Sequence, residues 1–198
     1  MDVMILLNVL LILLVIIGIG VFIWSARTFG LSPRVDPLAD HPETYDPLRI
    51  GVGDIVTYAG VDHVVGGTIT FDQEDFRWHE HLLDGSTGRR RLTVEYDEGE
   101  LEMTLWTPRE GTGLEPGGDV ILDDRVYRCV RSGSARFTAE GATGTASSGS
   151  MDYADYATDD QTGLLAFERC AKTASWTVST VRAVTRVDLT VVHSGPAV

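Results

Sequence analysis

Residues 90–106 read RRLTVEYDEGELEMTLW, and this stretch decides the fold. Its two arms are rich in the β-branched, aromatic and aliphatic residues that favour strands. Between them lies Asp97-Glu98-Gly99-Glu100, a segment of residues that favour turns. The stretch therefore predicts a β-hairpin with arms Arg90–Tyr96 and Leu101–Trp106.

The same texture extends outward from this hairpin, from Gly51 almost to the C-terminus. The predicted strands are Asp54–Tyr58, His63–Phe71, Phe76–Leu83, Arg90–Tyr96, Leu101–Trp106, Asp119–Leu122, Arg125–Ser132, Ala135–Glu140, Tyr153–Ala157, Leu164–Arg169 and Ser175–Val192, the last broken in two. Asp123-Asp124 predicts a second hairpin turn. No segment after Trp24 has a sustained helical period, so we expect an all-β, mostly antiparallel domain.

Two halves of this domain resemble each other. Gly53–Val56 recurs as Gly118–Ile121, and Leu92–Glu95 matches Leu165–Glu168, at offsets of 65 and 73 residues. The pattern fits two pseudo-repeated β units, residues 49–110 and 114–192, and it equally fits chance recurrence of short β patterns. In the first case Glu95 and Glu168 occupy equivalent strand positions.

The N-terminus predicts a membrane anchor over residues 1–26. Val3–Trp24 has 22 residues without a charged side chain, and a helix of that length reaches roughly 33 Å, enough to cross a hydrocarbon core of about 30 Å. Asp2 is the only charged residue before this run, so the basic region of a cleaved signal peptide is missing. A cleaved signal peptide and a buried globular helix remain the two alternatives to an anchor. Arg27 and Arg34 follow the run, which predicts a single-pass protein of the cell membrane with its C-terminal domain in the cytoplasm.

The remaining chain divides into a Pro-rich linker, residues 27–48, and a β-rich soluble domain, residues 49–198. The formal net charge of −13 argues against a nucleic-acid partner and favours a cationic one, either a basic protein face or a small polycation. Cys129 and Cys170 are expected to be reduced and buried in the cytoplasm.

A series of short features follows in order along the soluble region, including Trp78-His79-Glu80, with His81 after it, and Tyr153-Ala154-Asp155-Tyr156. The others are Asp46–Leu48, Gly53-Asp54, Val64–Thr68, Arg91–Glu95, Tyr127, Gly141, Gly144, Leu165–Arg169 and Trp176. Together they resemble a bacterial family, the domain of unknown function numbered 4178, which has an aromatic residue where His81 stands. The resemblance implies a β-rich domain without an assigned activity, often membrane-anchored in actinobacteria. It also implies genomic neighbours that encode membrane proteins and polyamine-synthase-like enzymes.

Trp78 and Glu80 share one strand face. They predict either a ligand pocket with an aromatic wall and a carboxylate, or a core tryptophan beside a glutamate paired with an arginine at the sheet margin. Residues 152–160 combine carboxylates with tyrosines, which suits a cation or a basic partner and equally suits turn and edge chemistry. The candidate ligand- or partner-binding residues are Trp78, Glu80, Glu95, Tyr153, Asp155, Tyr156 and Glu168.

Other patterns point to no chemistry. His79 and His81 share a face but lack a third ligand, so a solvated strand face is expected and no metal or cofactor. Arg89-Arg90-Arg91 predicts a charged edge strand or a contact with lipid or partner. No catalytic template appears.

We therefore expect a membrane-anchored, non-enzymatic accessory domain that has a protein partner at the membrane. A binder of a small, polyamine-like cation is the alternative, and an unrecognised enzyme with paired Glu95 and Glu168 comes third.

Overall fold

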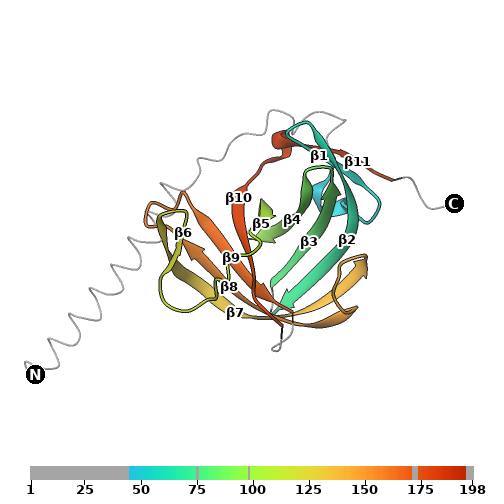
Figure 1. The fold of residues 1–198 in the computed structure, drawn as a ribbon. Helices are drawn as coiled ribbons and strands as arrows, with labels where there is room; N and C mark the ends of the chain where they lie inside the picture. Colours follow the sequence, from blue (N-terminus) through green and yellow to red (C-terminus); the bar gives the residue numbers. More distant parts are fainter. Residues whose placement is uncertain (1–44, 75, 98, 171–173, 195–198) are drawn as a thin grey trace, which may run out of the picture. The chain divides into compact units, whose positions relative to one another are not determined.

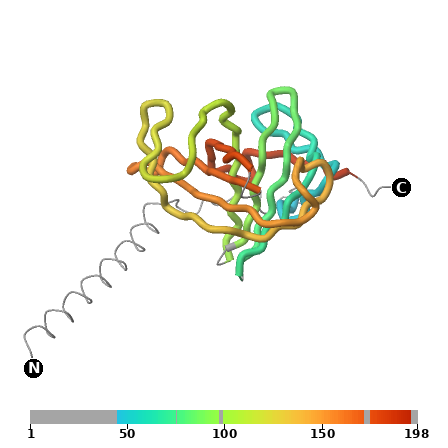
Figure 2. The backbone as a smooth tube through the Cα atoms, turned by 60° about the horizontal axis from the view of Figure 1, so that its bottom comes forward, coloured from blue at the N-terminus to red at the C-terminus, as the bar shows by residue number. Residues whose placement is uncertain are grey.

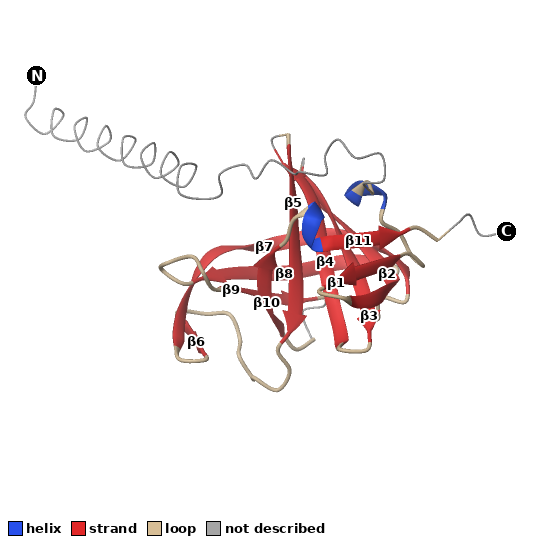
Figure 3. Cartoon of the chain, turned by 90° about the horizontal axis from the view of Figure 1, so that it is seen from above, coloured by secondary structure: helices blue, strands red, loops and turns tan. Residues whose placement is uncertain are grey.

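The computed structural model describes residues 45–74, 76–97, 99–170 and 174–194, which form a strand-rich domain with two short 3-10 turns (Figure 3). The 3-10 turns are η1 (Pro47–Arg49) and η2 (Arg186–Asp188). The strands are β1 (Ile55–Tyr58), β2 (Val61–Gln73), β3 (Phe76–Gly85), β4 (Gly88–Asp97), β5 (Glu100–Pro108), β6 (Val120–Leu122), β7 (Arg125–Gly141), β8 (Ser148–Ala157), β9 (Leu164–Arg169), β10 (Thr177–Ala183) and β11 (Leu189–Val192). The all-β, antiparallel prediction is confirmed.

In these described residues no helix has the length and apolar character needed to cross a membrane. The predicted anchor, residues 1–26, and the linker as far as residue 44 lie outside them. The linker's last residues do form structure, because Pro47 opens η1, where its missing N–H costs no hydrogen bond.

Each predicted strand is present, and the two predicted hairpin turns join β4 to β5 and β6 to β7. One boundary was wrong: Arg125–Ser132 and Ala135–Glu140 belong to a single strand, β7. Gly133 does not break this strand. It lies opposite Tyr153 in the sheet, and a Cβ there would come within 2.9 Å of the Tyr153 hydroxyl.

Eight of the strands close into a ring. Each is antiparallel to the next in the order β2, β3, β4, β5, β10, β9, β8, β7, and β7 pairs back with β2 (Figure 1). Strand β2 takes two partners along one edge: Val61–Val64 pairs with β1, and Gly67–Asp72 pairs with β7 after a register shift at Gly66. Figure 2 shows β7 and β8, yellow to orange, running side by side along one side of the ring.

The alternation of side chains gives each ring strand an inner and an outer face. Outside the ring, Leu92 and Val94 pack in a cluster with Val56 of β1 and Leu189 of β11. A second outer cluster joins residues of β8, β9 and β10 to Val120 of β6. Strands β1, β11 and β6 thus give the ring two external cores, and these leave the interior to a third cluster and to polar side chains.

The third cluster fills part of the ring interior with aromatic side chains. Phe71 stacks on Trp78 with ring centroids 5.0 Å apart, and Phe137 and Tyr153 contact the same pair. Trp78 is therefore a core residue at one end of the interior, as one of its two predicted alternatives required.

Two smaller expectations were wrong. Cys129 is exposed, although Cys170 is half-buried, and both are free thiols. The basic segment Arg89–Arg91 is no sheet edge, since β4 pairs on both sides, with β3 and β5. Arg89 pairs with Asp84 on the surface, and Arg91 turns inward.

Candidate functional site

A cavity of about 200 Å³ lies inside the ring, and each of the eight ring strands contributes at least one residue to its wall. The seven candidate residues from the sequence all line it: Trp78, Glu80, Glu95, Tyr153, Asp155, Tyr156 and Glu168. They come from β3, β4, β8 and β9. The structure therefore brings together side chains that are up to 90 residues apart in sequence.

Strand register explains this convergence. Trp78 lies opposite Glu95 in the β3–β4 ladder, and Glu168 lies opposite Tyr153 in the β8–β9 ladder. Residues directly opposite in antiparallel strands point to the same face, so each pair projects together into the interior. Tyr156 is the exception. It belongs mainly to an outer cluster, where its hydroxyl accepts a hydrogen bond of 2.8 Å from the Gly117 N–H.

The deepest polar group is a carboxylate–guanidinium–carboxylate cluster. Arg91 Nη1 donates to Glu80 Oε2 at 3.0 Å, and the same nitrogen contacts Glu168 Oε2. Glu80 is 1% exposed and Glu168 is 4% exposed, so both carboxyl groups are withdrawn from water. The guanidinium also lies over the Trp106 ring, 4.8 Å from its centroid. Glu80 does pair with an arginine, as predicted, but inside the cavity wall and not at the sheet margin.

Burial and charge change the acidity of this cluster. Burial, together with the nearby charge of Glu168, raises the pKa of Glu80 to about 8, although Arg91 opposes the shift. Glu80 is consequently protonated at neutral pH, while Arg91 also contacts Glu168.

A second ion pair lies in the same wall. Arg131 Nε donates to Asp155 Oδ2 at 3.0 Å, and its guanidinium lies 5.5 Å from the centroid of the Tyr153 ring. Burial raises the pKa of Asp155, and the charge of Arg131 opposes that rise. Tyr153 is fixed from the other side, because its hydroxyl donates to Gln73 Oε1 at 2.9 Å.

Two acceptor atoms in the wall are buried and have no hydrogen-bond partner among the residues that the structure describes. They are Oε1 of Glu168 and Oγ1 of Thr93. Counting every carboxyl as ionised, the cavity holds Glu80, Glu95, Asp155 and Glu168 against Arg91 and Arg131. Its formal charge is therefore negative, and it stays negative when Glu80 keeps its proton.

Sequence reasoning missed the arginines and Thr93. Arg91 was placed in a surface island, and Arg131 and Thr93 were not singled out. A signal existed for two of them: Arg91, Thr93 and Glu95 alternate along one strand, so all three share the face of the candidate Glu95.

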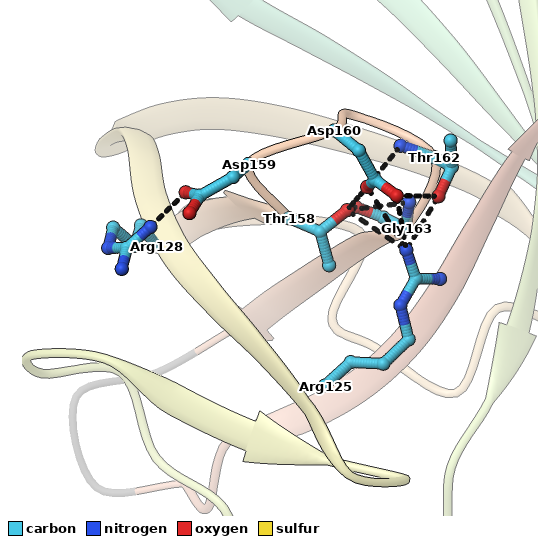
Figure 4. Close-up of polar contacts among 7 residues, drawn as sticks. All are labelled: Arg125, Arg128, Thr158, Asp159, Asp160, Thr162 and Gly163. Carbon is cyan, nitrogen blue, oxygen red and sulfur yellow. Dashed lines mark hydrogen bonds and ion pairs between the residues drawn. The ribbon is translucent and has the colours of Figure 1, made fainter.

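The acidic stretch 152–160 is not a free acidic surface. Asp152 pairs with Arg169, Asp159 with Arg128 and Asp160 with Arg125. Figure 4 shows the last two pairs at the turn between β8 and β9. There Asp160 also accepts hydrogen bonds from the Thr158 hydroxyl and from the Thr162 N–H, and these two bonds lower its pKa to about 2. For Asp159 and Asp160 the turn interpretation fits better than a docking surface.

The strand face of the two histidines is less solvated than expected. His81 is 3% exposed and His79 is half-buried, and their Nδ1 atoms hydrogen-bond to Thr68 and Thr70 at 3.0 and 3.1 Å. They point away from Glu80, as their spacing predicted. In the described part of the chain no cluster of three or more side chains is arranged to hold a metal ion.

The comparisons with known proteins point to one family. The family model described as "Domain of unknown function (DUF4178)" matches residues 51–186. Uncharacterized proteins of Mycobacterium tuberculosis and Mycobacterium bovis are each 39% identical to the chain over 168 residues, which is 82% of this chain and 82% of the relative. No solved structure matches the chain.

Proposed function

Because the chain belongs to the DUF4178 family, whose description carries no activity, its function has to be argued from the cavity, and we propose that it is a non-enzymatic binding domain for a small organic cation. The observation that carries the proposal is the excess of carboxyl groups in an aromatic-walled cavity inside the ring. The cavity's volume of about 200 Å³ lies below the roughly 300–1,000 Å³ of sites for drug-sized ligands. The part of the ligand that enters the cavity is therefore small.

The wider role that we propose is that of a membrane-anchored accessory protein. The uncharged run Val3–Trp24 supports an anchor, and the flanking arginines support a cytoplasmic domain. In this arrangement the domain senses or presents a cation beside a protein partner in the membrane. A polyamine-like compound is the class that the family resemblance favours.

The cation proposal is tested on the full chain in detergent. We expect spermidine to raise the melting temperature by more than sodium chloride of equal ionic strength does. Glu95→Gln, in the cavity wall, should reduce the spermidine effect. Asp159→Asn removes the same charge from an exposed turn and should leave the effect intact. Equal responses to spermidine and to sodium chloride would refute the proposal.

The accessory role is tested by affinity capture of the tagged full chain from its native membrane. A stoichiometric membrane protein in the eluate is expected. Recovery of the chain alone after mild cross-linking would count against a partner.

One observation favours a second function, an acid–base enzyme. A carboxyl with a pKa of about 8 in a cavity is suited to donate a proton near neutral pH. The third expectation from the sequence had put a raised pKa at Glu95 or Glu168, whereas burial raises the pKa of Glu80. Mass spectrometry of spermidine after incubation with the chain separates the two functions, because a binding domain returns the compound unchanged.

A further inference from the structure

The two unpartnered acceptors in the cavity wall restrict the chemistry of the ligand. Oε1 of Glu168 belongs to a carboxylate whose other oxygen contacts Arg91, and a carboxylate oxygen accepts hydrogen bonds but donates none. Buried acceptors of this kind are normally satisfied in folded proteins. In its protonated form Glu80 can donate one hydrogen bond to Glu168, and any further partner of Oε1 must bring an N–H or O–H group.

Thr93 lies beside the same cluster. It faces Glu80 across the β3–β4 ladder, and Arg91, two residues earlier on the same face, contacts both carboxyl groups. Its side chain is 5% exposed, and its hydroxyl has no hydrogen-bond partner among the described residues. Both unsatisfied acceptors thus border one end of the cavity.

The aromatic walls are unsuited to a cation that lacks N–H groups. Quaternary ammonium ions are recognised by open aromatic faces. Here Arg91 already covers a face of Trp106, and Arg131 covers a face of Tyr153. Trp78 has Phe71 stacked on it. The aromatic rings therefore shape the cavity but do not recognise the cation. The ligand is selected by its hydrogen bonds to oxygen atoms of the wall.

We propose that the cavity selects a small cation through its N–H groups, a primary ammonium or a guanidinium, which donate to Oε1 of Glu168 and Oγ1 of Thr93. This inference rests on the proposed function, since it specifies the cation of that same site. It adds that a quaternary ammonium ion of equal charge and chain length is rejected, because it leaves both acceptors unsatisfied.

The test compares butylammonium with butyltrimethylammonium on the full chain in detergent, followed by NMR or by thermal shift at constant ionic strength. Butylammonium is expected to bind at least tenfold more tightly. Equal or tighter binding of butyltrimethylammonium overturns the inference and leaves the cation-binding function standing. The absence of a response to either ion overturns the proposed function itself.

A variant locates the effect. Thr93→Val keeps the size of the side chain and removes the hydroxyl, and we expect it to weaken butylammonium binding at least fivefold. Its melting temperature should stay equal or rise, because the substitution removes an unsatisfied buried group. Thr107→Val, the same change on the exposed part of β5, is the control and should bind as the unaltered chain does. Unchanged binding by Thr93→Val would exclude Thr93 from the site.

Discussion

Glu80 shows how one buried residue reports on its surroundings. It stands on an inward-facing position of β3, where Arg91 Nη1 contacts both its carboxyl and that of Glu168. One arginine cannot neutralise two buried carboxylates, so the less favourable negative charge is removed by protonation. Burying these carboxyl groups lowers the stability of the fold. In the proposed function a bound cation offsets that loss, because it pairs with the negative charge that remains.

The protonation of Glu80 makes stability depend on pH. Its pKa is about 8 in the folded chain and 4.5 without the fold, so the stabilisation is complete below pH 4.5 and is lost as pH rises to 8. Glu80→Gln imitates the protonated form at every pH. We expect this variant to match the unaltered chain near pH 5 and to exceed its free energy of unfolding at pH 8.5 by at least about 1 kcal/mol. Urea unfolding at the two pH values measures this.

A matched control for that experiment is Glu102→Gln, which removes an exposed carboxyl from the neighbouring β5. It should show the same pH dependence as the unaltered chain. A Glu80→Gln variant that is less stable than the unaltered chain at pH 8.5 would show that the carboxyl is ionised and paired there.

His81 should produce a dependence of opposite sign at lower pH. Burial lowers its pKa from 6.5 to about 4, with a further contribution from His79. The unfolded chain therefore takes up the proton first, and stability is lost as pH falls from 6.5 to 4, by up to about 3 kcal/mol. His81→Phe cannot be protonated, so its unfolding free energy should fall less between pH 7 and pH 4.5. Urea unfolding at the two pH values measures this. If the unfolding free energy falls equally in the unaltered chain and in His81→Phe, the loss belongs to other groups.

At the level of elements, the sequence predicted hairpins well and the closure of the ring not at all. Strands and turns such as Leu101–Trp106 and Asp123-Asp124 are encoded locally, by residue type and turn chemistry. The pairing of β2 with β7 joins Gly67 to Gly141. No local sequence pattern predicts a contact between residues so far apart in the chain. Gly133 was misjudged for a related reason, because the need for a glycine came from Tyr153 on the adjacent strand.

Gly141 marks the point where β7 leaves β2, and it is the glycine on which ring closure depends. Its φ is +74°, and a Cβ would lie 2.6 Å from the Gly66 carbonyl oxygen and 3.0 Å from Gly67 Cα. Gly141→Ala therefore combines the left-handed backbone cost of roughly 1–2 kcal/mol with a clash against backbone. Gly144 has the same φ of +74° with open space around its Cβ position. We expect Gly141→Ala to lower the unfolding free energy by at least about 1 kcal/mol more than Gly144→Ala does. Equal losses in denaturant titrations would mean that the β2–β7 corner relaxes at little cost.

For the whole molecule, strand alternation gave the shared face of Trp78 and Glu80, but it could not give the place where the candidates of four strands meet. The cavity exists only because eight strands close, which puts Glu95 and Glu168 on the same interior wall. Arg91 was missed because a basic residue in an acidic chain looks like a surface feature until the closed sheet turns it inward.

The uncharged N-terminal run predicts that the chain is anchored in a membrane. The domain carries most of a formal net charge of −13, so anionic headgroups repel it, and any membrane attachment has to come from the apolar residues 3–24. The Leu, Ile, Val and Phe residues in that run each contribute about −0.3 to −0.6 kcal/mol to insertion, which outweighs one asparagine. The full chain should stay in the membrane pellet after an alkaline carbonate wash, and a variant lacking residues 3–24 should move to the supernatant.

Because Arg27 and Arg34 favour the cytoplasmic side, protease added to intact spheroplasts should spare the domain and digest it only after lysis. Digestion in intact spheroplasts would reverse the orientation, and it would then place the cavity where an extracellular cation reaches it first.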